Sequence, residues 1–395
     1  MGEKIVLGFG NNIDYEIRWN SSIVEKLIRD FRIHAAELNI DNNSIGTERE
    51  LLINILGFLK DSIGGERFIS NPKVIENFSG YFSKKVTVGG TSIRAAIAMA
   101  KLGCCSALHL VTLNDDVRRL LPKTCSWICS NKKETSYPHL IVQFHMGLRV
   151  DANDIHLESK RPNRIIYPYD IDNEIVLIDP GVTEMAKDAQ VFLVSGFNSM
   201  HDEALLEDRV KQVRGILKAL PDDTVVFFED ACYHIQKFSD ILRSYLLDDI
   251  DIYSLNEDEL GNYCGRTVVL TDPEDIGSAL KELRKKIPCG ILVVHTHCWA
   301  LAYGEKAADY RDALLGGVTM ATTRFRFGDD FTSENYIETG RLPLEEEGEK
   351  FSCGIKGILG NMVCSVPSFK VSERDVTTIG LGDAFVGGFL PALVK

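Results

Sequence analysis

One stretch near the C-terminal end of the sequence decides the expected fold, and it reads Thr377-Thr378-Ile379-Gly380-Leu381-Gly382-Asp383-Ala384-Phe385-Val386-Gly387-Gly388. It follows a strand-like run, Met362-Val363-Cys364-Ser365-Val366, and leads into an apolar segment. Two glycines one residue apart let the backbone turn tightly and point its N–H groups at one place. A helix that begins there adds the positive end of its dipole. The pattern is typical of a cradle for an anion.

Asp383 lies at the mouth of this cradle, where a carboxylate can act as a base. A phosphoryl-transfer site needs both features, because donors hold the moving group and a carboxylate accepts the proton of the attacking hydroxyl. The plain alternative is a glycine-rich turn with Asp at a helix N-terminus, where Asp is common. The stretch alone does not decide between the two, because short glycine motifs are weak evidence.

The composition is that of a globular chain with room for one large and one smaller domain. The chain has 395 residues, of which 45% are hydrophobic and 26% charged. A net charge of −13 argues against sequence-independent nucleic-acid binding, but it leaves small anionic substrates open. No apolar run approaches the ~20 residues of a membrane span, and no signal-peptide pattern opens the sequence. We therefore expect a cytoplasmic protein without a membrane partner.

The ten cysteines are scattered along the chain, several of them inside apolar runs. Cys125 and Cys129 stand four apart without a second pair at zinc-finger spacing. We expect buried, reduced thiols.

Strand-like and helical runs alternate along most of the sequence. Apolar runs typical of buried strands occupy residues 5–10, 106–112, 191–196, 224–228, 251–255 and 290–294, and helical patterns occupy 21–63, 93–102, 204–220 and 273–286. This alternation predicts a mainly parallel sheet covered by helices. The strand-like runs at 139–146 and 164–169 break the rhythm and predict a small β-rich subdomain. The acidic segment 342–350 is expected to be a solvated connection.

Polar side chains follow several of these strands at the edge where open α/β sheets bind ligands. Asn256 and Glu259 share one face of a predicted helix, which suits either a hydrated Mg²⁺ or an N-terminal capping box. Glu229 ends another strand, and His295-Thr296-His297 ends a third. Ordinary hydrogen bonding is the simpler role for the two histidines, because no third zinc ligand stands nearby. Asp14 follows the first strand and suits either sugar hydroxyls or an Asx turn.

The sequence resembles the ADP-dependent sugar kinases, the glucokinase/phosphofructokinase branch of the ribokinase-like superfamily. The resemblance covers nearly the whole chain and rests on the order and spacing of several motifs. These motifs are Asn12-Ile13-Asp14, Gly64-Gly65-Glu66-Arg67-Phe68, Val88-Gly89-Gly90, Arg161-Pro162-Asn163-Arg164-Ile165-Ile166, Val194-Ser195-Gly196-Phe197, Asn256-x-x-Glu259, Val294-His295-Thr296 and Thr378-Ile379-Gly380-Leu381-Gly382-Asp383.

The resemblance implies a role for each matching residue. Asp383 would be the base for the sugar hydroxyl, and Gly380 and Gly382 would help form the anion hole. Mg²⁺ would be placed, through its waters, by Glu229, Asn256, Glu259 and Asp383. The nucleotide would contact His295, Thr296, Leu381 and Arg164, the last reaching down from a lid. The sugar would contact Asp14, Glu66, Gly89 and Gly90.

The same resemblance implies a three-layer αβα ribokinase-like fold with a small β-rich lid. The large nucleotide-binding and catalytic domain would comprise residues 1–16, 82–135 and 185–395. The discontinuous lid and substrate domain would comprise residues 17–81 and 136–184. The partners would be a small-molecule sugar and a nucleotide, and the protein would be a monomer or a small homo-oligomer.

Three positions depart from the family pattern. Phe227 replaces the His of a His-x-Glu signature, so a polar partner near the metal is lost. Thr91 replaces the usual Asn or Gln after the glycine pair, and Arg94 follows closely. Gln143 stands where relatives often carry Glu. The basic Arg94 and the uncharged Gln143 both favour a phosphorylated sugar.

We expect, on this basis, a Mg²⁺-dependent kinase that transfers the β-phosphoryl group of ADP to a hexose and releases AMP. Glucose is the favoured acceptor, because Asp14 and Glu66 are present. The alternatives are an ADP-dependent phosphofructokinase acting on fructose 6-phosphate, an ATP-dependent ribokinase-like kinase, and a non-catalytic sugar or nucleotide sensor.

Overall fold

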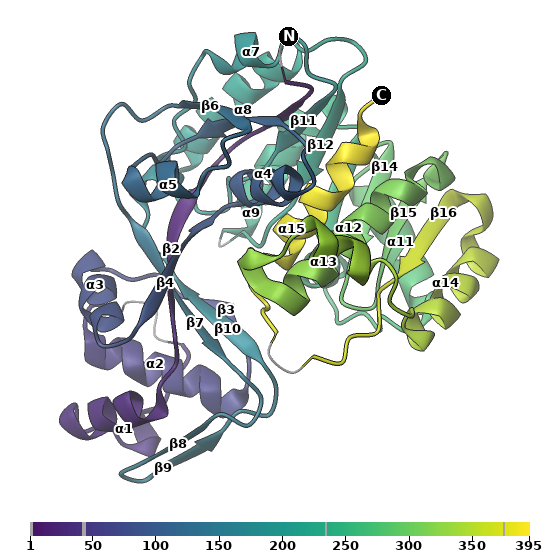
Figure 1. Cartoon of the computed structure of the whole chain (residues 1–395). Coiled ribbons are helices and arrows are strands. Elements are labelled where there is room, and N and C mark those ends of the chain that lie inside the picture. The colour runs from purple at the N-terminus through teal and green to yellow at the C-terminus, as the bar shows by residue number, and fades with distance from the viewer. Residues whose placement is uncertain (1–2, 42–44, 234, 374–375) are drawn as a thin grey trace.

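The computed structural model describes residues 3–41, 45–233, 235–373 and 376–395, and it contains two β-sheets of unequal size (Figure 1). The larger sheet lies within a body of helices, and the smaller sheet projects from it at the lower left of the view. Among the described residues, no helix is both long enough and apolar enough to cross a membrane.

The larger sheet has nine strands, and those from β6 to β14 run parallel. β15 is antiparallel to both of its neighbours. The order is β16 (Val363–Pro367), β15 (Trp299–Gly304), β14 (Ile291–His295), β13 (Ile252–Asn256), β12 (Val225–Glu229), β11 (Val191–Val194), β1 (Ile5–Leu7), β5 (Ser106–Leu110) and β6 (Cys125–Cys129). Its central strands are continuous apolar runs, as expected where helices cover both faces of a sheet.

Helices cover both faces of this sheet and form two separate apolar cores. One face carries α8 (Glu203–Leu217), α9 (Gln236–Leu246), α10 (Glu257–Cys264), α11 (Pro273–Lys286) and α14 (Glu346–Leu359). The other carries α4 (Thr91–Lys101), α5 (Asp115–Leu120), α12 (Arg311–Phe327) and α15 (Leu381–Phe389). Shorter elements complete this part: α6 (Ile171–Ile175), α7 (Val182–Met185), α13 (Ser333–Thr339), η2 (Leu247–Asp249), η3 (Ala307–Tyr310), η4 (Gly328–Asp330), η5 (Gly360–Met362) and η6 (Leu390–Leu393).

The C-terminal helix α15 packs unusually closely on its neighbours. A Cβ at Gly388 would lie 2.2 Å from the carbonyl oxygen of Gly316 on α12, and one at Gly387 would lie 2.8 Å from that of Ala95 on α4. No side chain fits at these distances, so the last two glycines of the opening stretch serve helix packing. These contacts fix α15 closely against α4 and α12.

The smaller sheet has five strands of mixed direction. The order is β3 (Gly65–Glu66), β10 (Asn163–Tyr167), β7 (Pro138–Phe144), β2 (Asn12–Ile17) and β4 (Lys84–Gly89). One face packs on α1 (Ser21–Asp30), α2 (Glu48–Asp61) and α3 (Pro72–Gly80), with η1 (Ala35–Glu37) beside them. A two-stranded ribbon, β8 (Arg149–Ala152) and β9 (Ile155–Glu158), lies at the far end of this domain (Figure 1).

The opposite face of the smaller sheet is polar and faces the large body. Along β2, Ile17 belongs to the apolar core, whereas Asp14 and Glu16 alternate with it and turn toward α4. Gln143 on β7 and Arg164 on β10 are directly paired across the strands and share that face. The alternation of apolar and polar residues is what a half-buried sheet requires.

The boundaries between the two parts differ from those expected. β2 and β4 lie in the smaller sheet, although residues 1–16 and 82–135 were assigned to the large domain. The chain returns near residue 170, before the expected 184, because Asp172 and Asn173 of α6 bond to Thr112 and Asn11 of the large body. We propose that the smaller domain comprises residues 12–89 and 136–169.

Two further expectations need correction. The acidic segment 342–350 is not wholly a connection, because α14 begins at Glu346, where acidic residues favour the positive end of a helix. All ten cysteines are free, but only Cys289 is buried, because the others lie near helix ends, on edge strands, in loops or, for Cys353, on the exposed face of α14.

Candidate active site

The carboxyl ends of β12 and β14 meet the N-terminus of α15. Glu229 ends β12 and accepts a hydrogen bond from Nε2 of His295, which ends β14, at 2.9 Å. The His295 ring stacks on Phe385 of α15 with 4.7 Å between ring centroids. A Cβ at Gly382 would lie 3.4 Å from the same imidazole ring. The expected anion cradle therefore lies at the carboxyl edge of the sheet.

The cradle itself is the first turn of α15. Gly380 caps this helix with a φ of +64°, a left-handed conformation that favours glycine. The backbone N–H groups of a helix's first turn have no partners within the helix, and they carry the positive end of its dipole. Leu381 is the first residue of the helix and Asp383 lies one turn in. The local geometry is that predicted from the spacing of the glycines.

The carboxylate of Asp383 is held by the first turn of α4. Its Oδ1 accepts a hydrogen bond from the Thr91 hydroxyl at 2.8 Å, and its Oδ2 lies 3.7 Å from Nε of Arg94. Thr91, expected to weaken a sugar contact, instead orients the candidate base.

Arg94 connects this base to the smaller sheet. Its Nη2 donates to Oδ2 of Asp14 at 2.8 Å and lies 3.6 Å from Glu16. Its Nη1 lies 3.8 Å from Asp329 of η4. Burial opposes the charge of Arg94, but Asp14 and the other carboxylates around it raise its pKa above the usual value. Asp14, the expected sugar ligand, is thus paired with a guanidinium.

The expected glycine pair has a structural reason of its own. A Cβ at Gly89 would lie 2.5 Å from the Asn12 amide, and Gly90 has a φ of +98° against the backbone of Gly10 and Asn11. Any larger residue would push β2 away from α4. Glu66 lies on β3, opposite Ile166.

Arg164 lies on β10, paired with Gln143 on the polar face of the smaller sheet. Burial lowers its pKa, whereas the charge of Asp383 acts in the opposite direction, followed by those of Asp258 and Glu66. Opposite charges favour the charged form of the guanidinium. The expected contact of Arg164 with nucleotide phosphates stays a prediction.

The expected metal ligands serve partly as a helix cap. The Asn256 side chain accepts from the backbone of Asp258 at 2.9 Å and of Glu259 at 3.0 Å, and Glu259 accepts from the Asn256 backbone at 2.8 Å. This is the capping box that the sequence predicted as the alternative to a metal site. No group of three His, Cys, Asp or Glu side chains in the described part of the chain could hold a metal directly.

The chemistry of these groups nevertheless suits a hydrated cation. Oε2 of Glu229 is buried without a hydrogen-bond partner. Burial, with Asp230 next, raises the pKa of Glu259 well above its usual range. A divalent cation held through waters would stabilise both carboxylates.

The expected nucleotide contacts at the end of β14 also have structural partners. Burial opposes protonation of His295, but the Glu229 carboxylate beside it raises the pKa of the imidazole. The Thr296 hydroxyl donates to the Trp299 carbonyl at 2.9 Å and accepts from the Cys298 and Trp299 backbone. These bonds close the turn between β14 and β15. His297 contacts Glu257 at 3.1 Å and is apart from Glu229.

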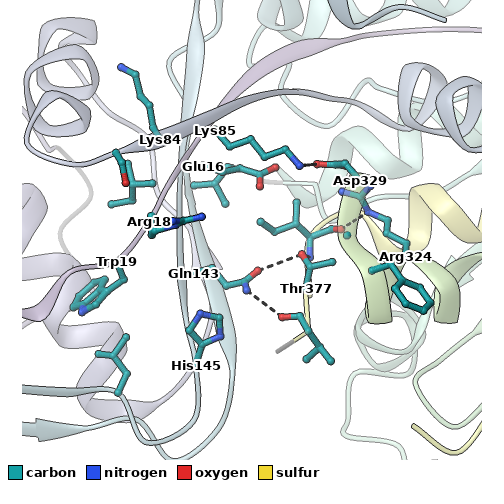
Figure 2. Close-up of a pocket in the computed structure, with 18 of the residues that line it drawn as sticks. Glu16, Arg18, Trp19, Lys84, Lys85, Gln143, His145, Arg324, Asp329 and Thr377 are labelled. Atoms are coloured by element: carbon teal, nitrogen blue, oxygen red, sulfur yellow. Dashed lines mark hydrogen bonds and ion pairs between the residues drawn. The ribbon is translucent and has the colours of Figure 1, made fainter. Parts of the chain in front are cut away.

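A cavity of about 850 Å³ opens between the polar face of the smaller sheet and the C-terminal end of α12 (Figure 2). The side chains of Arg18 and Lys85 line it from the sheet, and Arg324 and Asp329 line it from the large body, whereas the Lys84 ammonium points away from it to Ser79 and the Tyr15 ring. Thr377 and Ile379, which lead into the cradle, form part of its wall. Gln143 contacts this wall through the Val376 carbonyl at 3.3 Å.

Sequence reasoning did not single out the charged residues of this cavity, Arg18, Lys85, Arg324 and Asp329. They come from separated segments, and no motif connects them. The alternation of Asp14, Glu16 and Arg18 along one strand was the available signal, because a period of two places all three on one face.

Two of three comparisons with known proteins found matches that agree with this geometry. The family model described as "ADP-specific Phosphofructokinase/Glucokinase conserved region" matches residues 3–390. A search of curated proteins found no match. The chain is similar to two structures from Pyrococcus horikoshii OT3. One is a phosphofructokinase with AMP, 17% identical with a TM-score of 0.79, covering 99% of this chain and 98% of that one.

The other is a hypothetical ADP-dependent phosphofructokinase, 18% identical with a TM-score of 0.80, covering 100% of this chain and 99% of that one. An ADP-dependent kinase in complex with fructose-6-phosphate and ADPbetaS is 14% identical with a TM-score of 0.75, covering 99% of this chain and 94% of that one. These likenesses confirm the expected ribokinase-like fold class. Because the family model spans nearly the whole sequence, the chain belongs to the ADP-dependent phosphofructokinase/glucokinase family and is a phosphotransferase with an alcohol group as acceptor.

Proposed function

We propose that this kinase transfers the β-phosphoryl group of ADP to a hydroxyl of a sugar that already carries a phosphate, and releases AMP. The observation that supports this acceptor is the cationic cavity beside the cradle. Its lining includes four Lys or Arg side chains, namely Arg18, Lys85, Arg324 and Arg326, against the two acids Glu16 and Asp329. In a chain of net charge −13, this is a local reversal of sign.

Part of this positive charge is free to meet a ligand. Among the described residues, neither Arg18 nor His145 has a side-chain hydrogen bond or ion pair, and both line the cavity. Lys85 is shared between Asp329 and Asp330, and Arg324 is paired with Asp329. Burial raises the pKa of Glu16. A phosphate group of the acceptor would be stabilised there.

The reaction follows from the residues at the cradle. Asp383, oriented by Thr91, would accept the proton of the attacking hydroxyl, and the first turn of α15 would stabilise the phosphoryl oxygens. Arg164 would contact the nucleotide phosphates from the smaller domain. Mg²⁺, held through waters by Glu229, Asn256 and Glu259 with Asp383 facing it, would neutralise phosphate charge.

Glucose is the second candidate acceptor, and the first expected from the sequence. Asp14 and Glu66 are the residues that favour it. The ion pair between Asp14 and Arg94 weighs against it, because a neutral hydroxyl would have to displace a charged donor at 2.8 Å.

An acceptor and donor screen tests the proposal. Fructose 6-phosphate and glucose are each incubated with ADP and Mg²⁺, and AMP is measured. We expect kcat/KM at least about tenfold higher for the sugar phosphate, since a charged hydrogen bond contributes about 1.5–3 kcal/mol. Higher turnover of glucose overturns the acceptor assignment. Turnover with ATP alone overturns the donor assignment, and ligand binding without turnover favours the sensor.

A variant of the cavity sharpens this screen. Arg18→Met should raise KM for the sugar phosphate about tenfold while kcat stays near that of the wild type. Arg29→Met, an exposed arginine on α1 of the same domain, is the matched control and should change neither constant. An unchanged KM in Arg18→Met contradicts the role of the cavity. Removal of Mg²⁺ with EDTA should abolish turnover.

A further inference from the structure

Arg94 lies where two helices and the smaller sheet meet, and no role in the family pattern accounts for it. It is in the first turn of α4, and its side chain is only 5% exposed. Burying a guanidinium is costly unless its charge is paired and its donors are used. The two edges of the Arg94 guanidinium differ in how their donors are used.

One edge of the guanidinium is anchored. Nη2 donates to Asp14 at 2.8 Å, and Glu16 lies 3.6 Å away. Asp14 is itself fixed, because its other oxygen accepts from the Asn12 amide at 2.6 Å. The anchor therefore belongs to β2 of the smaller domain.

The other edge faces the cradle with its donors loosely engaged. Nε lies 3.7 Å from Asp383 and Nη1 lies 3.8 Å from Asp329, both beyond hydrogen-bond distance. The same Nη1 lies 2.9 Å from the place that a Cβ on Gly380 would occupy. Among the described residues, Asp14 accepts the only hydrogen bond that the Arg94 side chain donates. Donors of a buried cation are thus available within contact of the turn that caps α15.

A phosphoryl group in the cradle would lie beside this edge. Its three equatorial oxygens carry the negative charge of the transition state, and fixed cations in a water-poor site stabilise that charge. Asp329 does not cancel the charge of Arg94, because Arg324 and Lys85 are also paired with it. A glycine at position 380 is what permits the guanidinium to approach.

We propose that Arg94 is a catalytic residue that donates from its Nε–Nη1 edge to the oxygens of the transferring phosphoryl group, while Asp14 anchors its Nη2. The acceptor oxygen forms a bond to the β-phosphorus of ADP, and its proton passes to Asp383. The bond from phosphorus to the bridging oxygen breaks, and its electron pair leaves with AMP. The inference rests on the proposed function for the donor. It changes the expected role of Asp14 from a sugar ligand to an anchor.

Steady-state kinetics separate this role from a structural one. Arg94→Met and Arg94→Lys should lower kcat about 10³-fold, as loss of a transition-state arginine does, with KM for the acceptor changed less than threefold. Asp14→Asn should lower kcat about tenfold. If Asp14 were a ligand of the sugar, the same substitution would raise KM for the sugar instead. The double variant Asp14→Asn/Arg94→Met should be no slower than Arg94→Met alone.

Two controls cover loss of folding. Arg209→Met removes another buried arginine, on α8, and should leave kcat unchanged. Arg94→Ala should regain part of its kcat with millimolar methylguanidinium if it is folded. A kcat within threefold of wild type in Arg94→Met, or an effect on KM alone, overturns the proposal.

A transition-state mimic tests Arg94 without turnover of any acceptor. AMP with aluminium fluoride and Mg²⁺ should raise the melting temperature of the wild type, and AMP alone should raise it less. Arg94→Met should lose only the increment from aluminium fluoride. If that increment depends on Arg94 while no sugar is phosphorylated, the proposed function fails and this inference stands. An equal increment in both proteins overturns the inference.

Discussion

At the scale of single residues, the candidate base Asp383 is held by Thr91, a residue that departs from the family pattern. Thr91 is shorter than the amide residues usual at its position, and this placed a sugar contact in doubt. The structure gives its hydroxyl a different partner, because it donates to Asp383 Oδ1 at 2.8 Å. A hydrogen bond to a carboxylate contributes about 1.5–3 kcal/mol. Thr91 therefore holds the Asp383 carboxylate in one orientation.

Removal of this hydroxyl should slow the reaction. We expect Thr91→Val to lower kcat about tenfold, because the Asp383 side chain loses its orientation, while KM for the acceptor changes little. Thr91→Ser keeps the hydroxyl and should stay within threefold of the wild type. AMP release under saturating substrates measures both, with thermal unfolding as the check on folding. A fully active Thr91→Val would show that Asp383 needs no such support.

Residue-scale prediction from the sequence succeeded where the cause was local. Gly380 was predicted because a tight turn into a helix needs a left-handed φ, and that requirement lies within a few residues. Arg94 could only be noted as a nearby basic residue. Its four carboxylates come from positions 14, 16, 329 and 383, which only the folded chain brings together.

At the scale of elements, apolar runs predicted the parallel strands well. β11 and β14 are buried throughout, and such strands need only a continuous hydrophobic sequence. The need for glycine at positions 387 and 388 could not be predicted from the sequence. It arises because the backbone of α4 and α12 lies 2–3 Å from the place that a Cβ would occupy. The cap of α10 shows the same limit, since a capping box and a metal site use the same spacing.

β5 carries a buried histidine that should make the fold sensitive to acid. His109 is fully buried against Phe9, its Nε2 accepts from the Asp179 backbone at 2.9 Å, and burial lowers its pKa to about 4. The unfolded chain therefore binds one more proton than the native state between that value and 6.5. The free energy of unfolding should fall by up to about 3 kcal/mol as pH drops through this window.

Urea unfolding at several pH values tests this loss. His109→Gln keeps a side chain of similar length that does not titrate, so its stability should change less between pH 6.5 and 4 than that of the wild type. Other groups titrate in the same window, and the difference between the two proteins isolates His109. Parallel pH curves for the two proteins would contradict the assignment.

At the scale of the whole molecule, the first two crossings between the domains lie in short segments between elements. Residues 8–11 connect β1 to β2, and Gly90 connects β4 to α4, with Gly8 and Gly10 at the first crossing and Gly89 and Gly90 at the second. Composition could predict that a second, β-rich unit exists. It could not place the crossing points, because these depend on which of the two sheets each strand joins.

The same arrangement sets a negative protein around a positive cavity, and this predicts a dependence on salt. The net charge of −13 repels anions at long range, whereas Arg18 and its neighbours attract them at the cavity. Added salt screens exposed charges over a Debye length of about 10 Å at 0.1 M and about 3 Å at 1 M. The attraction at the cavity acts on the bound acceptor at short range. Its weakening by salt should therefore change KM more than the weakening of the long-range repulsion does.

We therefore expect KM for a phosphorylated acceptor to rise several-fold between 0.05 and 0.5 M KCl, with kcat nearly constant. KM for glucose, a neutral sugar, should stay nearly level over the same range. Arg18→Met should reduce the salt dependence for the phosphorylated acceptor, because it removes a cation without an ionic partner among the described residues. Initial rates at fixed ADP and Mg²⁺ measure all three. Equal salt dependence for the charged and neutral acceptors would mean that the cavity does not bind the phosphate, and that salt acts on the nucleotide or on the closure of the two domains.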